Sequence, residues 1–150
     1  MSGEDPQEKP PKRPPFVETL RPGMEGRVEH VVEERHLADS LGNKGAKVLA
    51  TPIIIGWLED VSSTIVRPHL PERVLSVGTL VNVRHLSAAL AGFTVVFRSR
   101  LREVDGRRLV FDVEAHDGVE KVAEGVHERF IVDEEKFLAK AAKKRPESRE

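Results

Sequence analysis

The chain has 150 residues, of which 39% are hydrophobic and 33% are charged, and its formal net charge is −1. This length suits one domain with a real core, and the near-neutral charge gives no whole-molecule argument for binding nucleic acid or an anionic membrane. Cysteine is absent, which excludes disulfides, thiolate nucleophiles and Cys-ligated zinc and fits a reducing compartment, the cytoplasm. No apolar run approaches the roughly 20 residues that a membrane-spanning helix needs.

The N-terminal part of the chain is rich in proline. Residues 1–22 hold six of the ten prolines and few apolar residues, so we predict a tail outside the folded domain, and residues 143–150 have the same character. The folded domain is therefore expected at 23–142. Alternation over 24–35 predicts a first strand, whereas 36–50, with two glycines and no clean period, predicts a long loop.

A central helix is predicted at 51–66. Thr51 followed by Pro52 is a helix-start signal, with Thr51 as the N-cap and proline at the first helical position. The apolar residues that follow at helical spacing are Ile54, Trp57 or Leu58, Val61 and Ile65. Two prolines in the segment 67–73 end the helix.

The rest of the chain is predicted to be mainly β. Runs rich in Val and Phe predict four strands, at 74–86, 92–104, 107–116 and 119–132. Asp-Gly pairs between the last three strands predict tight hairpins, and a short charged helix closes the domain at 133–144. The fold class is α+β: one antiparallel sheet wrapped around one helix, the hot-dog architecture. Its open sheet edge predicts a homodimer, with a tetramer left open.

The third predicted strand has two unlike faces. Phe93, Val95, Phe97 and Leu101 form the inner face, matched across the turn by Leu109, Phe111 and Val113. Arg98, Arg100 and Arg102 point the other way. They form either a solvated outer face or a contact to nucleotide phosphates.

Glu59 is the first candidate for catalysis. The ordinary interpretation of a helical Glu is a solvated face. Helical geometry instead places Glu59 at the border of the apolar stripe, while Asp60 lies further round and is the better candidate for a solvated acid. A carboxylate beside apolar walls suits a general base or a nucleophile.

Three further residues could join Glu59. His85 is predicted to share a strand face with Thr79, Val81 and Val83. It is either a hydrogen-bonded core histidine or the partner of an acid on the facing helix. Thr51 is a helix cap that could also bond a carbonyl or a water. Eight residues of straight helix separate it from Glu59 by about 12 Å, so direct contact is not expected. Gly78 is either a bulge or a backbone donor to a thioester oxygen.

The blocks "VLATP", "SVGTLVNVRHLSAALAG", "EVDGRRLVFDVEAHDG" and "GVHERFIVDEEKF" resemble, in order and spacing, the fluoroacetyl-CoA thioesterase-like family of hot-dog proteins, over residues 23–140. The resemblance implies that Thr51, Glu59 and His85 are catalytic and that Gly78 helps to hold the thioester carbonyl. The fluoroacetate-resistance enzyme carries bulky aromatic lid residues where residues 39–48 of this chain have none, so fluoroacetyl selectivity is not expected.

The expected function is hydrolysis of an acyl-CoA thioester, with the acyl group open and no cofactor. Glu59 acts as nucleophile or as base, His85 moves the proton, and the dimer partner completes the CoA groove. The alternatives are a hot-dog enoyl-CoA hydratase and a non-catalytic acyl-CoA binding module. The histidines show no metal-ligand spacing among themselves, so no metal site is expected.

Overall fold

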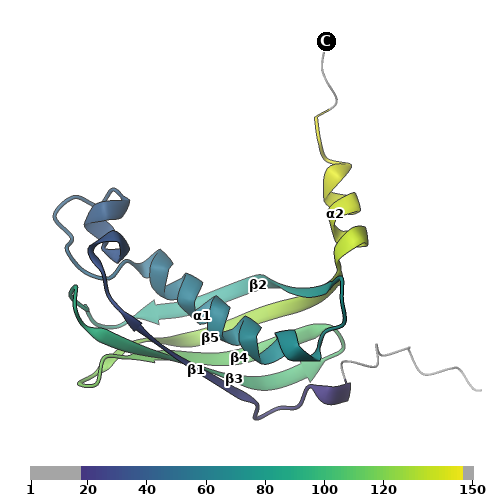
Figure 1. The fold of residues 1–150 in the computed structure, drawn as a ribbon, viewed down its shortest axis with the longest axis horizontal. Coiled ribbons are helices and arrows are strands. Elements are labelled where there is room, and N and C mark those ends of the chain that lie inside the picture. The colour runs from purple at the N-terminus through teal and green to yellow at the C-terminus, as the bar shows by residue number, and fades with distance from the viewer. Residues whose placement is uncertain (1–17, 147–150) are drawn as a thin grey trace, which may run out of the picture.

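The computed structural model describes residues 18–146, and in this part of the chain five strands form one antiparallel sheet with a helix across one face (Figure 1). The main elements are β1 (Glu25–Val31), α1 (Thr51–Val66), β2 (Val74–His85), β3 (Thr94–Asp105), β4 (Arg108–His116), β5 (Lys121–Asp133) and α2 (Glu134–Ala142). Short 3-10 helices lie before and after α1: η2 (Glu34–His36), η3 (Ala38–Leu41) and η4 (Arg67–His69). The predicted α+β fold is confirmed. None of the described helices is long and apolar enough to cross a membrane.

The spatial order of the strands is β1-β3-β4-β5-β2. The predicted hairpins join β3 to β4 and β4 to β5, and their turn glycines, Gly106 and Gly118, have φ angles of 60° and 94° that suit glycine. The sheet edges are β1 and β2. The outer side of β2 has no strand partner among the described residues, which leaves one row of backbone hydrogen-bonding groups open.

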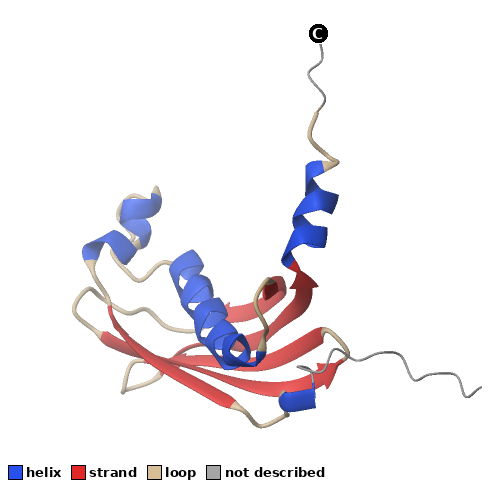
Figure 2. Ribbon diagram, turned by 45° about the vertical axis from the view of Figure 1, so that its right-hand side comes forward, coloured by secondary structure: helices blue, strands red, loops and turns tan. Residues whose placement is uncertain are grey.

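The core lies between α1 and the sheet (Figure 2). The helix buries one stripe, made up of Ile54, Leu58, Val61, Ser62, Ile65 and Val66. Opposite this stripe, β3 and β4 bury the alternate residues predicted for the inner face, with Phe97 and Phe111 both 0% exposed. Phe93 is the exception: it precedes β3 and is 40% exposed, so its assignment to the inner face was wrong. Trp57 is only partly buried and packs against the edge of this core.

Two details of the prediction for α1 and β2 were wrong. The N-cap of α1 is Ala50, whose backbone is extended, and Thr51 is the first helical residue. The Thr51 hydroxyl caps no backbone N–H and instead contacts the His85 side chain. In β2, the register shifts between Gly78 and Leu80. This bulge puts Gly78, rather than Thr79, in the helix-facing row with Val81.

The described residues include parts of both predicted tails. Of the predicted N-terminal tail, residues 1–17 lie outside the described residues, and Leu20 is 4% exposed and belongs to the core. Of the predicted C-terminal tail, 147–150 lie outside them. Helix α2 follows β5 directly and projects beyond the sheet, and it contains no buried residue (Figures 1 and 2).

Candidate active site

Thr51 and His85, predicted separately, lie in contact. The Thr51 hydroxyl, at the start of α1, is 2.8 Å from His85 Nδ1, at the end of β2. The backbone before Thr51 is fixed, because Leu49 N donates to the Ala89 carbonyl at 2.8 Å and Ala50 N donates to the His36 carbonyl at 2.9 Å. The loop therefore holds the hydroxyl against the histidine.

The second ring nitrogen of His85 is free. His85 Nε2 is buried and has no hydrogen-bond partner within the described chain. Buried polar atoms in native proteins are almost always paired, so an open nitrogen of this kind calls for an explanation. An imidazole that is held at one nitrogen and open at the other is suited to transferring a proton.

Glu59 lies over Gly78 on the inner face of the sheet. The Glu59 side chain is half-buried, as its helical position predicted, whereas Asp60 is exposed. A Cβ atom at Gly78 would lie 3.4 Å from Glu59 Oε1 and 3.3 Å from His127 Cε1. The absent side chain thus makes room for the carboxylate directly above the strand. The bulge that was the alternative interpretation of Gly78 is also present, and the two features coincide.

Two functional candidates on β5, His127 and Arg129, were missed. His127 is 1% exposed and Arg129 is 7% exposed. Arg129 donates through Nε to the Ser76 hydroxyl at 2.9 Å, and its Nη1 lies 3.2 Å from His127 Nε2. The other ring nitrogen, Nδ1, is 2.8 Å from the Leu80 carbonyl. A guanidinium only donates and a carbonyl only accepts, so His127 is neutral with its proton on Nδ1.

The charge of Glu59 influences the pKa of both His127 and Arg129. Burial lowers the pKa of His127, and the Arg129 charge lowers it further, while the Leu80 carbonyl and Glu59 oppose the change. Burial also lowers the pKa of Arg129, and Glu59 is the strongest influence in the opposite direction. The Glu59 carboxylate therefore lies close to the buried His127–Arg129 pair, which carries one positive charge, on Arg129. The sequence signal was the alternation His127, Arg129, Ile131 on an otherwise apolar face.

Within one chain, the Thr51–His85 pair and the Glu59–Gly78 pair lie apart. Both α1 and β2 are continuous between the relevant residues. Eight residues of helix separate Thr51 from Glu59 by about 12 Å. Seven residues of strand separate Gly78 from His85 by roughly 23 Å. The three predicted catalytic residues therefore do not meet in a single protomer.

The arginines of β3 lie on the other side of the sheet. Arg98 and Arg100 alternate with buried residues and line a concavity of about 900 Å³ on the face away from α1. None of Thr51, Glu59 and His85 lines it. Arg102 lies 3.5 Å from Asp112. A substrate on the helix side of the same protomer is therefore out of reach of these side chains.

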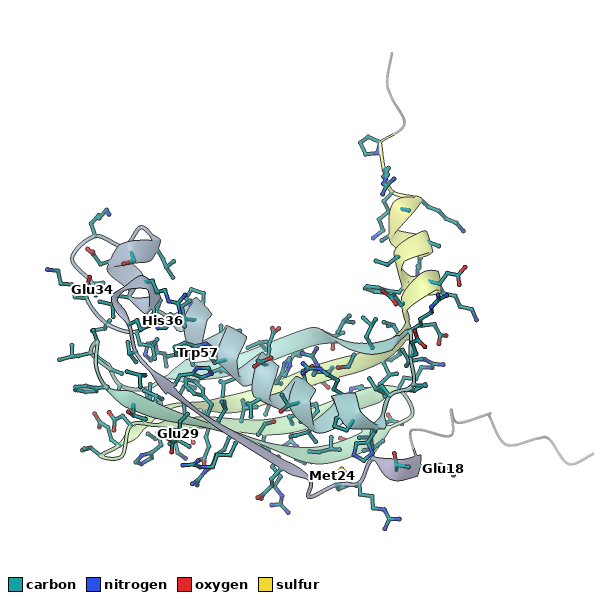
Figure 3. All side chains as sticks on the ribbon, viewed as in Figure 1. Glu18, Met24, Glu29, Glu34, His36 and Trp57 are labelled. Atoms are coloured by element: carbon teal, nitrogen blue, oxygen red, sulfur yellow. The ribbon has the colours of Figure 1, made fainter. Side chains whose placement is uncertain are left out.

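The loop before Thr51 is anchored on α1. Trp57 stacks on His30 with ring centroids 4.2 Å apart and meets the edge of His36 at 4.7 Å (Figure 3). Burial lowers the pKa of His30. The His36 carbonyl also accepts the hydrogen bond from Ala50 N. The aromatic cluster therefore fixes the backbone that leads to Thr51. Within residues 18–146 no group of three or more potential metal ligands converges.

An antiparallel sheet wrapped around one helix places the chain in the class of hot-dog proteins, and in this chain the helix carries an acid and has a hydroxyl–histidine pair at its start. The chain belongs to the family described as fluoroacetyl-CoA-specific thioesterase (FlK), whose model matches residues 32–135. A fluoroacetyl-CoA thioesterase from Streptantibioticus cattleyicolor is 40% identical over 100 residues, which cover 67% of this chain and 72% of that protein.

Solved structures give the same answer for the fold. The fluoroacetyl-CoA thioesterase FlK matches with a TM-score of 0.78 and 34% identity, over 85% of this chain and 98% of that one. A Thermus thermophilus thioesterase superfamily member matches with a TM-score of 0.76 and 28% identity, over 82% of this chain and 91% of that one. A hot-dog-like protein from Thermanaerovibrio acidaminovorans matches with a TM-score of 0.81 and 23% identity, over 89% of this chain and 98% of that one. At this identity the match supports the fold alone.

Proposed function

We propose that the protein is an acyl-CoA thioesterase that adds water to a thioester and releases a free acid and CoA. The observation that carries the proposal is the pairing of Thr51 with His85, which leaves His85 Nε2 open, together with the Glu59 carboxylate over Gly78. Family membership gives this set of groups its chemistry, since relatives of the chain are named for thioester hydrolysis.

The proposed active site is shared between two copies of the chain. If β2 pairs antiparallel with its copy about a two-fold axis at Asn82, Val81 lies opposite Val83 of the partner subunit, and the bulge brings Gly78 opposite the partner's His85. Directly opposed residues are about 5 Å apart, so the partner's His85 would reach the Glu59 carboxylate. The support is the open edge of β2, where Leu80 and Val81 are 42% and 36% exposed. A dimer then holds two identical sites.

Each group has a role in such a site. Glu59 either attacks the thioester carbonyl and displaces CoA, forming a mixed anhydride that water then cleaves to free acid and Glu59 carboxylate, or takes a proton from a water that attacks the thioester directly. The partner's His85 donates through Nε2 to the departing CoA sulfur, with the partner's Thr51 orienting the ring. The Gly78 amide is proposed to meet the developing oxyanion. CoA then binds in the groove between the two copies.

We propose no particular acyl group, because the loop before Thr51 gives no sign of selectivity for one. The loop 39–48 contains no aromatic residue, so the aromatic lid of the resistance enzyme has no counterpart in it. We expect the enzyme to accept acyl-CoAs other than fluoroacetyl-CoA. A cytoplasmic location agrees with the cysteine-free composition and with CoA as a substrate.

The test is to incubate purified protein with a panel of acyl-CoAs, fluoroacetyl-CoA included, and to follow free thiol. Thiol release that disappears in Glu59→Ala and His85→Ala is the expected result. Addition of water to an enoyl-CoA without thiol release would make the protein a hydratase. Tight binding of every substrate without turnover would make it a binding module.

A further inference from the structure

Helix α2 has an apolar side that nothing within residues 18–146 covers. Phe137 and Leu138 are 40% and 56% exposed, and no residue of α2 is buried. Isolated helices shorter than about 12 residues are marginal in water, and most of their stability comes from packing an apolar face. A nine-residue helix with no buried residue therefore needs a surface that the described part of its own protomer does not supply.

A second uncovered apolar surface follows β2. Residues 86–93 carry no charged side chain in a chain that is 33% charged. Leu86 and Leu90 in this segment are 48% and 50% exposed. The segment is otherwise well fixed, because Ala89 is buried and accepts the hydrogen bond from Leu49 N.

The strand pairing proposed above brings these two surfaces together. Helix α2 starts beside the beginning of β2, since Asp133 pairs with Val74 and Glu134 N donates to the Arg73 carbonyl. Antiparallel pairing places the beginning of β2 next to the end of β2 in the other copy, and so next to 86–90 of that copy. Helix α2 rises past the β2 edge at this end of the sheet, on the side where a copy would lie (Figures 1 and 2).

We propose that α2 of each protomer packs its Phe137–Leu138 side on residues 86–90 of the partner subunit and thereby positions the partner's Thr51–His85 pair. Residue 86 follows His85 directly, and Ala89 is tied to the chain two residues before Thr51. The helix acts on both members of the pair without touching substrate. This inference rests on the proposed function, because the same chain supplies Glu59 to that site.

The test uses the absence of cysteine in the chain, which makes any introduced cysteine unique. Leu138→Cys and Leu90→Cys proteins are mixed, allowed to exchange subunits, and treated with a short flexible bismaleimide. A covalent mixed dimer is expected. Leu138→Cys mixed with Asp105→Cys is the control, because the pairing places the tip of the β3–β4 hairpin far from the partner's α2, and Leu138→Cys alone should not crosslink.

A kinetic measurement accompanies the crosslink. Leu138→Asp is expected to leave the dimer mass unchanged in light scattering and to lower kcat about 10-fold with little change in KM, whereas Leu138→Met keeps kcat near the wild-type value. A dimer of normal activity that gives no Leu138–Leu90 crosslink would overturn the role of α2 and leave the thioesterase intact. A wild-type monomer that hydrolyses acyl-CoA would overturn the shared site and this inference together.

Discussion

Glu59 and Asp60 are adjacent acids that the fold treats differently. Glu59 is half-buried over Gly78 and faces the Arg129 cation, whereas Asp60 is exposed and lies 4.0 Å from Arg67 at the surface. Surface ion pairs of this kind contribute little, so Asp60 has no comparable surroundings in which to act. The proposed chemistry therefore predicts different consequences for the two substitutions.

Glu59→Gln is expected to lower turnover at least ~10²-fold with little change in thermal stability, because an amide neither attacks nor accepts a proton. Asp60→Asn is the matched control and should keep wild-type turnover. The measurements are thiol release and a melting curve for each variant. Equal turnover in wild type and Glu59→Gln would remove Glu59 from the mechanism.

His127 connects the site to the pH dependence of stability. Its pKa in the folded state is lowered by burial and by Arg129 from the unfolded value of about 6.5. Below that value the unfolded chain takes up a proton that the folded chain resists, so stability is fully present above about pH 6.5 and decreases as the pH falls below it. His30, whose pKa is also lowered, contributes in the same direction.

In His127→Gln, the amide can donate to Leu80 and accept from Arg129 without titrating. We expect the melting temperature of this variant to fall less steeply than that of the wild type between about pH 7.5 and about pH 5.5. Val119→Gln, which changes an exposed side chain without a titratable group, should keep the wild-type slope. Parallel curves for wild type and His127→Gln would contradict a neutral buried ring.

At the residue scale, the sequence predicted which side chains face the site better than which of them contact one another. Glu59 at the border of the helix stripe follows from helical spacing, and His85 facing the helix follows from alternation. The bond between Thr51 and His85 could not be predicted, because it depends on how the loop 36–50 returns to the sheet. The sequence likewise predicts Thr51 as the N-cap, whereas Ala50 occupies that position. His127 and Arg129 were passed over because charged and polar side chains on an inner strand face run against the usual pattern.

At the scale of elements, periodicity and turn chemistry were sufficient for most of the fold. The five strands, the central helix and both Asp-Gly turns follow from local signals. The close approach of β2 to β5 does not, because it joins residues that are far apart in the sequence. A Cβ atom at Gly125 would lie 2.0 Å from the Asn82 carbonyl oxygen and 2.7 Å from Val83 Cα, so β2 and β5 approach closely only with glycine at 125.

Gly125→Ala is therefore expected to lower the free energy of unfolding by more than about 3 kcal/mol, because the contact is with backbone and the strand must move. Gly56→Ala on α1, where a Cβ meets nothing within 4 Å, should raise it by up to about 1 kcal/mol from helix propensity. Denaturant unfolding measures both. An alanine that is tolerated at 125 without loss would refute the close approach of β2 and β5.

At the scale of the whole molecule, the proposed site needs a second copy of the chain, because Thr51 and His85 lie apart from Glu59 in one protomer. The helix keeps Thr51 and Glu59 about 12 Å apart in any fold that contains it. The two-fold pairing of β2 removes this distance by taking the acid from one chain and the hydroxyl–histidine pair from the other. The sequence indicated a dimer through the open edge of its sheet, but it gave no register for the pairing.

The most direct test of the shared site is complementation between two inactive variants. Glu59→Gln and His85→Ala proteins are mixed, allowed to exchange subunits, and assayed for thiol release from an acyl-CoA that the wild type hydrolyses. In a mixed dimer, one site combines an intact Glu59 from one chain with an intact His85 from the other, so random exchange should restore about a quarter of wild-type turnover. If each site takes both residues from one chain, every site in the mixture carries a defect. Turnover that stays at the level of the separate variants, despite mixed dimers detected by mass, would contradict the account.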